Sequence, residues 1–396
     1  MPINKFMDIL TYSNLYRAYL DCRRTKRKTV NALKFEIDLE RNLQLLLAEL
    51  KSGKYQPGRS ICFVVTNPVP REIFAAEFKD RIVHHLLIRE ILSIGERNFI
   101  FDSYACRKNK GTHQAINRLK KFIRQITSNG NKNVFYAQLD VKGFFMAIDQ
   151  RILYHLTKKL VNKQKRSQHW KQDVLWLAKN IIFHNPAENY ITKGDSALFN
   201  LIPTYKSLRC QPKGRGLPIG NYTSQFFANL YLNELDQFIK RELKCKYYIR
   251  YVDDLILLDV DKEKLKYLRN KINNFLIKKL GLELNVNKIR IQSLAKGIDF
   301  LGYFIKPDYV LVRQKVIKRL KNNLFKINFT NFKFLKKQMF LKRNLAMINS
   351  YYGHFNHAQS FNLRKNIYNS YLAELRSVFS PKKGFNCLKM NNKYVA

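Results

Sequence analysis

The chain has 396 residues, and its 73 Lys and Arg against 29 Asp and Glu give a formal net charge of +44. A hydrophobic fraction of 46% excludes an intrinsically disordered chain, and the length predicts two or three subdomains. So large a positive charge indicates a polyanionic partner. A membrane surface is a weaker explanation, because no basic amphipathic helix stands alone at a terminus. The abundance of Lys, Asn and Ile is also typical of AT-rich coding, so the net charge overstates the functional surface.

Six cysteines are scattered without a C-x-x-C spacing. This pattern is typical of reduced thiols in a cytoplasmic protein, not of a disulfide framework or a zinc site. The start of the chain lacks signal-peptide character, and no apolar run approaches the length of a membrane span. We therefore expect a cytoplasmic protein without a membrane partner.

The first third of the chain is expected to be mostly helical. Helices with a leucine-rich stripe are predicted within 11–51, followed by a strand of β-branched and aromatic residues at 61–66. A helix is predicted from about Phe74 to Ile94. A polar, basic loop at 98–113 leads into a further helix that ends near Ile126.

The rest of the chain alternates strands and helices. The stretch 157–216 mixes helical segments with a strand-like piece at 189–192. Helices are predicted at about 223–243 and 262–280, and strands at 134–141, 282–292, 298–305 and 309–313. The remainder is expected to be helical and basic. We predict one interlocked α+β body with a helical appendix.

Two adjacent carboxylates form the most informative motif, Tyr251-Val252-Asp253-Asp254. Apolar runs on both sides predict two short buried strands, which puts the acids at the bend of a β-hairpin. Two like charges there repel each other, and Mg²⁺ is a cation that would neutralise them and prefers such hard oxygen ligands. A solvated turn is the alternative interpretation.

A third carboxylate favours the first interpretation. Asp140 ends the apolar run 134–141 and is followed by Phe144 and Phe145. A two-metal site for nucleotidyl transfer needs about three carboxylates from neighbouring strand ends. Asp140, Asp253 and Asp254 meet that demand and predict a nucleotide polymerase.

Further motifs occur in a fixed order along the chain. They are Pro70-Arg71-Glu72-Ile73, Phe78-Lys79-Asp80-Arg81-Ile82-Val83-His84-His85, Ser103-Tyr104-Ala105-Cys106-Arg107, Asp140 with Phe144-Phe145, Leu217-Pro218-Ile219-Gly220-Asn221-Tyr222-Thr223-Ser224-Gln225, the Tyr251–Asp254 motif and Phe300-Leu301-Gly302-Tyr303. With this set the chain resembles the reverse transcriptases from about residue 10 to about residue 370. It resembles specifically the prokaryotic branch that holds diversity-generating-retroelement and defence-associated enzymes.

The resemblance implies a right-hand polymerase with an antiparallel palm sheet and a helical thumb. Residues 1–133 would form N-terminal helices and fingers with part of the palm, 134–305 the palm with the primer-grip hairpin, and 306–396 a basic thumb and tail. It also implies an RNA-directed DNA polymerase that uses dNTPs, an RNA template, expected to be a dedicated non-coding RNA, and two Mg²⁺ ions, with Mn²⁺ as a substitute. The implied metal ligands are Asp140, Val141, Asp253 and Asp254, and the product is DNA.

The resemblance also assigns roles around the nucleotide. Lys288 matches a lysine that protonates pyrophosphate, a sensible general acid. Phe145 matches an aromatic gate against the 2′-hydroxyl, although one of Phe144 and Phe145 is expected to be core. The other nucleotide-binding positions are Arg71, Ile219, Gly220 and Gln225. Many relatives carry glutamine where this chain has Ile219, and in diversity-generating enzymes a similar replacement accompanies low fidelity at template adenines; neutral packing is the alternative.

Basic residues are predicted to contact nucleic acid. They are Arg107, Lys110, Lys315, Lys318, Arg319 and Lys321. Such side chains contact the phosphate backbone and carry no sequence code. Aromatic residues between the thumb cations, such as Phe325, are expected in the helix core and not as stacking platforms.

Several alternatives remain open from the sequence. Glu374 is the only acid after residue 308, which argues against a fused nuclease or integrase, since these also need carboxylates. The stretch 157–216 is long for a compact diversity-generating enzyme, so mutagenic and antiviral roles are both retained. A retron or group II intron enzyme is disfavoured, because Ser224-Gln225 replaces the Ser-Pro usual in intron enzymes. The rival from another class is a non-catalytic RNA-binding protein on a polymerase-like fold. An accessory protein or an oligomer is left open.

Overall fold

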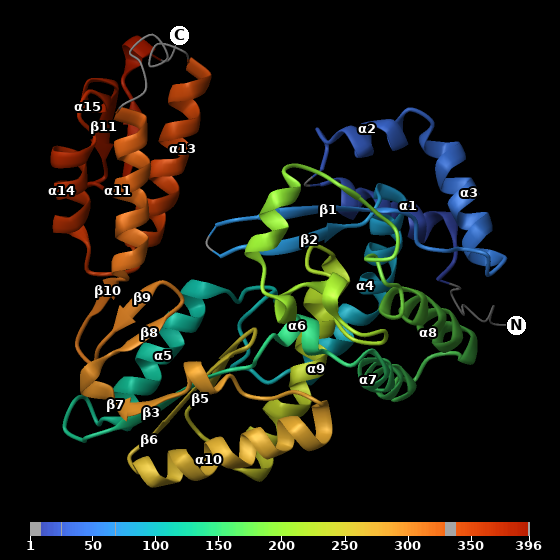
Figure 1. The fold of residues 1–396 in the computed structure, drawn as a ribbon, viewed down its shortest axis with the longest axis horizontal. Helices are drawn as coiled ribbons and strands as arrows, with labels where there is room; N and C mark the ends of the chain where they lie inside the picture. The colour runs from blue at the N-terminus through green and yellow to red at the C-terminus, as the bar shows by residue number, and fades with distance from the viewer. Residues whose placement is uncertain (1–8, 25, 68, 329–337, 395–396) are drawn as a thin grey trace, which may run out of the picture. The chain divides into compact units, whose positions relative to one another are not determined.

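A computed structural model describes residues 9–24, 26–67, 69–328 and 338–394 of the chain. The chain divides into two compact units. The first is built from 1–111, 137–257 and 266–290, and the second from 112–136, 258–265 and 291–396. Helices and strands alternate in both (Figure 1), which confirms the predicted α+β class. The finer division into fingers, palm and thumb stays a prediction. In the described part of the chain, no helix has the length and apolarity to cross a membrane.

The first unit starts with the predicted helices α1 (Tyr12–Arg23), α2 (Val30–Glu36) and α3 (Leu39–Lys51). The Thr11 side chain caps α1 by accepting a hydrogen bond from the backbone of Asn14. Strand β1 (Ser60–Val65) is confirmed, but the helix predicted from Phe74 begins later. Residues 71–75 form strand β2 (Arg71–Ala75), antiparallel to β1, and helix α4 runs from Phe78 to Asn98.

Strands β1 and β2 belong to a three-stranded sheet with the order β2-β1-β4. Strand β4 (Tyr190–Thr192), the predicted strand-like piece, runs parallel to β1. The other elements of the stretch 144–242 are helical: α6 (Phe144–Ala147), α7 (Gln150–Asn162), α8 (Gln168–Ile182), the 3₁₀ turns Ser196–Leu201, Thr204–Lys206 and Leu208–Cys210, and α9 (Tyr222–Gln237) with the π-helical turn Phe238–Glu242. Helix α9 is buried over most of its length and packs against α4, where Gly95 leaves room for the Phe226 ring.

A four-stranded sheet has the order β5-β6-β3-β7. Its strands are β5 (Tyr248–Tyr251), β6 (Asp254–Asp259), β3 (Phe135–Asp140) and β7 (Arg290–Ser293), and β5 and β6 form the predicted antiparallel hairpin. The predicted helix at 262–280 is α10 (Lys262–Phe275) with the π-helical turn Leu276–Leu280. The strand predicted at 282–292 is wrong for most of its length. A 3₁₀ turn, Val286–Lys288, interrupts it, because the Asn285 backbone N–H bonds to the carbonyl of Asp140.

The second unit holds α5 (Thr112–Ile126) and the C-terminal elements. The single strand predicted at 298–305 is wrong: Leu301 and Gly302 turn the chain at φ +51° and +89°, which separates β8 (Ile298–Phe300) from β9 (Tyr303–Ile305). Strand β10 (Val310–Val312) pairs with β9, and α11 (Gln314–Asn328), α13 (Gln338–Phe355), α14 (Phe361–Tyr371) and α15 (Leu375–Val378) follow in Figure 1. The expected helical remainder is also wrong at the end, where β11 (Phe379–Lys382) and β12 (Cys387–Met390) form a hairpin.

A buried ion pair joins α9 to β5. Arg250 is 1% exposed and Asp236 is 0% exposed. The guanidinium donates to both Asp236 oxygens at 2.7–3.0 Å, and the Tyr248 hydroxyl donates to the same carboxylate at 2.7 Å. Arg250 Nη1 completes its set with the Asn229 side chain and the carbonyl of Val252. The charges are therefore tolerated in the core because nearly all of their hydrogen-bonding capacity is used.

We expect Asp236→Asn to lower the free energy of unfolding by about 3–5 kcal/mol, since it leaves Arg250 charged and unpaired in the core. Glu234→Gln is the matched control on the same helix. Glu234 pairs with Lys159 at 3.3 Å near the surface, and such pairs contribute about 0–1 kcal/mol. Urea titration of both variants measures the difference, and equal losses would contradict a special role for the buried pair.

Candidate active site

The hairpin between β5 and β6 has a two-residue turn. Tyr251 pairs with Asp254, so Val252 and Asp253 form the bend. Val252 has φ +55°, a strained conformation for a β-branched residue that costs on the order of 1–3 kcal/mol and persists only where the surroundings enforce it. Arg250 Nη1 donates to the Val252 carbonyl at 3.0 Å. The buried pair thus holds the turn that carries the two acids.

Asp140 reaches the same place from the end of β3. The backbone N–H of Val141 donates to the carbonyl of Asp253 at 3.3 Å. Asp140 is 6% exposed, and its carboxylate accepts hydrogen bonds from Lys288 Nζ at 2.8 Å and from Asn285 Nδ2 at 3.2 Å. The structure therefore brings together three predicted residues, Asp140, Asp253 and Lys288, from three segments of the chain, and the bond between Lys288 and Asp140 spans 148 residues.

The charges of these groups influence one another. Burial first, and then the negative charge of Asp140, raise the pKa of Asp253 to about 6, while Lys288 and Arg71 oppose the rise. Burial lowers the pKa of Lys288, but the hydrogen bond to Asp140 and the charges of the aspartates outweigh it and raise the pKa overall. The site thus holds excess negative charge that one ammonium group only partly balances.

This donor set can be tested for its fit to a metal ion. Across the described segments, no group of three or more His, Cys, Asp and Glu side chains is arranged to hold a metal as it stands. Asp140 and Asp253 suit a divalent cation as a pair, because burial and the charge of Asp140 raise the pKa of Asp253 and hard carboxylate oxygens suit Mg²⁺. For Asp254 and the buried Val141, the role of metal ligand stays a prediction.

The predicted nucleotide residues lie on neighbouring segments. Phe144 is 2% exposed and belongs to the core, whereas Phe145 is half-buried and packs, like Ile219, against the cluster around Phe74. Gly220 has φ +129°, and a Cβ there would lie 2.7 Å from the carbonyl oxygen of Phe74, so only glycine fits this approach.

Arg71 and Gln225 are the other two predicted nucleotide contacts. Both side chains are exposed, Arg71 at the start of β2 and Gln225 on α9. The charge of Arg71 acts on the pKa of Asp253, so its guanidinium and the site influence each other. Binding of a nucleotide by either residue remains a prediction.

Two predicted nucleic-acid contacts in the first unit are engaged within the protein. The Arg107 side chain is 6% exposed and donates to Glu96 and to the carbonyls of Ile100 and Ser103. Lys110 donates to the carbonyl of Phe101 and lies over its ring at 3.4 Å. These contacts give both side chains a structural role, and their contact with nucleic acid stays untested.

The other predicted contacts lie on α11. Its buried face carries Ile317, Leu320, Leu324 and Ile327. Lys315 and Lys318 are exposed and Arg319 is half-buried, while Lys321 donates to the Tyr371 hydroxyl at 2.8 Å. The expectation that Phe325 lies in the core is wrong, since the side chain is 63% exposed.

Sequence reasoning missed Asn285, Asp236 and Arg250 as parts of the site. A signal existed for one of them: an arginine inside an apolar strand must find a buried partner. Nothing local pointed to Asn285, whose bond to Asp140 spans 145 residues.

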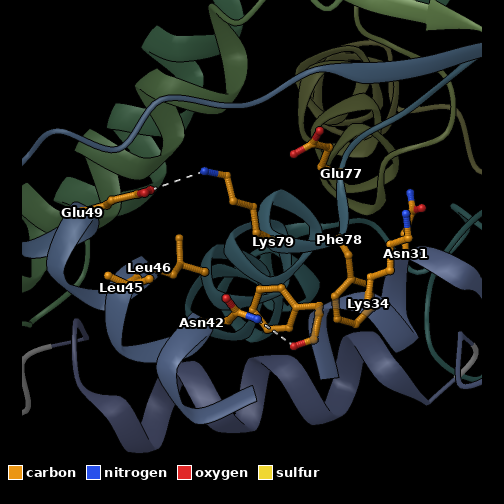
Figure 2. Close-up of a pocket in the computed structure, with 10 residues that line it drawn as sticks. Asn31, Lys34, Asn42, Leu45, Leu46, Glu49, Glu77, Phe78 and Lys79 are labelled. Atoms are coloured by element: carbon orange, nitrogen blue, oxygen red, sulfur yellow. Dashed lines mark hydrogen bonds and ion pairs between the residues drawn. The ribbon is translucent and has the colours of Figure 1, made fainter. Parts of the chain in front are cut away.

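The described residues also line an open pocket of about 460 Å³ between α2, α3 and the start of α4 (Figure 2). Lys79 crosses it to pair with Glu49 at 3.5 Å, and Asn42 donates to the carbonyl of Phe35. The Lys79 ammonium group is therefore paired within the protein, with Glu49 on α3 as its partner. Asp80 instead accepts hydrogen bonds from Tyr55 and Gly58, so this motif serves the packing of the N-terminal helices.

Comparison with known proteins places this geometry in a family. Residues 70–305 match the family model "Reverse transcriptase (RNA-dependent DNA polymerase)". Protein YkfC of Escherichia coli (strain K12) is 25% identical over 69% of this chain and 74% of its own length. The group II intron-encoded protein LtrA of Lactococcus lactis subsp. cremoris is 22% identical over 67% of this chain and 50% of its own length.

Solved structures of telomerase are also similar. One from Candida albicans, with a TWJ fragment of telomeric RNA, is 12% identical over 85% of this chain, with a TM-score of 0.47. Apo telomerase from Candida tropicalis is 14% identical over 80% of this chain, with a TM-score of 0.48. This chain spans 63% and 56% of those two chains, less than two thirds of either. Because the family model covers more than half of the sequence, the chain belongs to the reverse transcriptase (RNA-dependent DNA polymerase) family.

Proposed function

We propose that this chain synthesises cDNA on an RNA template by two-metal nucleotidyl transfer. The observation that carries the proposal is the meeting of Asp140 and Asp253, two like-charged carboxylates from different strands, beside Lys288. A non-catalytic RNA-binding protein has no need to keep such a repulsive pair. The family match supports the same activity.

The residues divide the work as follows. Asp140, Asp253 and Asp254, with the backbone of Val141, would hold Mg²⁺ or Mn²⁺, which when bound lowers the pKa of a primer 3′-hydroxyl and neutralises charge on the departing pyrophosphate. Lys288 is protonated at neutral pH, because its pKa is raised, and Nζ holds the proton that the pyrophosphate needs.

The remaining contacts orient the substrates. Arg71 would bind the triphosphate, and Gln225 and the backbone of Gly220 would approach the nucleotide. The Phe145 ring would exclude a 2′-hydroxyl. The exposed cations of α11, Lys315 and Lys318 foremost, would bind the phosphate backbone of RNA or DNA, a contact that weakens steeply as salt rises.

The biological setting that we propose is a bacterial or phage system, either a diversity-generating retroelement or an antiviral defence, with a dedicated non-coding RNA as template. Ile219, in place of the glutamine common among relatives, and Gln225, in place of the proline of intron enzymes, support it. A group II intron role is the second candidate, favoured by the similarity to LtrA.

The test of this function is to express the chain with its native flanking locus and to sequence the DNA that it makes. We expect DNA that depends on the acids and is absent with the Asp253→Asn/Asp254→Asn variant. Copies of one template altered mainly at adenines would indicate a retroelement, and simple-repeat or untemplated DNA a defence polymerase. Copies of an intron would indicate the second candidate, and no DNA at all, with RNA still bound, the non-catalytic protein.

We expect Asp253→Asn to abolish polymerisation and yet to stabilise the metal-free protein. The folded pKa of about 6 lies above the ordinary 3.8, so the native state binds more protons between these values and loses stability as pH rises through them. The free energy of unfolding of the variant should therefore exceed that of the wild type by almost nothing below pH 4 and by up to about 3 kcal/mol above pH 6.

Thermal unfolding across this pH range, with and without Mg²⁺, measures the effect. Mg²⁺ should stabilise the wild type at pH 8 and not the variant. Asp308→Asn, at an exposed turn, is the control for the change in charge. A gain of equal size in both variants, or Mg²⁺ stabilisation that survives in Asp253→Asn, would refute the paired-carboxylate site.

We expect Ile219→Gln to reduce misincorporation opposite template adenines by about tenfold or more. A tenfold change needs only about 1.4 kcal/mol of difference between the transition states for the correct and the incorrect nucleotide. Sequencing of the products of both enzymes on one RNA template gives the error spectra. Because the Ile219 side chain packs against the Phe74 cluster, thermal unfolding serves as the control for packing. Equal spectra in two stable proteins would mean that Ile219 only fills space.

A further inference from the structure

Residues 187–210, here the insertion segment, connect α8 to the loop before α9. They contain β4 and three short 3₁₀ turns, and thus little regular structure. The segment is nevertheless fixed at its first part. β4 pairs with β1, the Lys193 backbone N–H donates to the carbonyl of Cys62 at 2.8 Å, and that of Ser60 donates to Asn189 at 3.1 Å.

A single buried carboxylate fixes the other end. Glu72 is 2% exposed. Its two oxygens accept hydrogen bonds from the Ser207 hydroxyl at 2.8 Å, the Leu208 backbone N–H at 2.9 Å and Arg209 Nε at 2.8 Å. All three donors belong to the insertion segment. A buried carboxylate with three donors is a stable anchor, and the loss of its charge leaves donors in the core without an acceptor.

The anchor lies next to a predicted nucleotide contact. Successive side chains of a strand point to opposite faces. On β2 the exposed Arg71 therefore lies on one face, while the buried Glu72 and Phe74 lie on the other. The insertion segment covers that second face and supports the strand from behind.

The same segment lies behind the proposed gate. Phe199, Ile202 and Leu208 form one buried cluster with Cys62, Phe74 and Met146, and the half-buried Phe145 and Ile219 pack on it. The Arg209 guanidinium lies 4.1 Å from the centre of the Phe199 ring, and Leu208 belongs both to the anchor and to the cluster.

Backbone hydrogen bonds connect these parts. The Leu217 N–H donates to the carbonyl of Phe145 at 2.8 Å, and the Phe74 N–H donates to that of Ile219 at 2.9 Å. A Cβ at Gly216 would lie 2.5 Å from the Leu208 side chain, so the segment also contacts this loop closely. A movement of the segment would thus be transmitted to both Phe145 and Ile219, the two residues that we propose to lie beside the nucleotide.

We propose that the insertion segment, anchored by Glu72, positions Phe145 and Ile219 and thereby sets the discrimination between deoxyribonucleotides and ribonucleotides. The inference rests on the proposed polymerase function and assigns its sugar selectivity to residues that touch no substrate. Glu72, Ser207 and Arg209 act as positioning residues. When the anchor is lost, the support behind Phe145 loosens, and a 2′-hydroxyl is accommodated.

The test is single-nucleotide incorporation by the full chain on an RNA template with a DNA primer and Mg²⁺, with kcat and KM for each dNTP and its rNTP. Glu72→Gln should lower the ratio of the two kcat/KM values on the order of tenfold, since small misplacement of a positioned group has effects of this size. The kcat for dNTP should change much less. Glu188→Gln is the matched control, an exposed residue of the same segment.

Ser207→Ala, which removes one hydrogen bond, tests the anchor if Glu72→Gln does not fold. Phe145→Ala removes the ring and gives the kcat/KM ratio of a site without the gate. Glu72→Gln added to Phe145→Ala should not lower this ratio further. An unchanged ratio in folded, active Glu72→Gln or Ser207→Ala, or an equal loss for both sugars, would overturn the inference alone. A wild-type protein that incorporates no nucleotide would overturn the proposed function and the inference with it.

Discussion

The buried pair of Arg250 and Asp236 is the interaction on which the rest of the site depends. Taking two charges out of water costs several kcal/mol for each ion unless hydrogen bonds satisfy them, and here Tyr248, Asn229 and the Val252 carbonyl complete the set. One of these bonds reaches the strained turn beside Asp253. The core of the first unit therefore enforces a backbone conformation that the sequence of the turn would not adopt by itself.

From this turn outward, each acid is held by its neighbours. Asp253 is linked through its carbonyl to Val141, and Asp140 is linked through its carboxylate to Lys288 and Asn285. The positive groups limit the repulsion but do not remove it, and burial together with the charge of Asp140 keeps the pKa of Asp253 raised. A site that holds charge for a reaction is expected to lower the stability of the fold that carries it.

The sequence correctly predicted Asp140 at a strand end and Asp253 at a hairpin bend, because each signal is local. Asp140 and Asp253 follow apolar runs, and such runs predict strands whichever partners they find. The strand β2 was missed because no glycine or proline separates Ile73 from α4, and only pairing with β1 makes residues 71–75 extended. The hairpin of β11 and β12 had a signal, Pro381 and Gly384, that the helical interpretation passed over. Glu72 could not be assigned, since its donors lie 135–137 residues away.

The two attachments of the insertion segment have a consequence for how this enzyme can vary. Between β4 and the turn that starts at Ser196, the chain is exposed, and a Cβ at Gly194 would meet no neighbouring atom within 4 Å. Each doubling of the length of a flexible loop adds only about 0.6 kcal/mol to the entropic cost of closing it. Extra residues at this point would therefore leave both attachments intact. This tip is therefore the natural place to graft a peptide tag or a fluorescent reporter onto the chain without disturbing Glu72 or its donors.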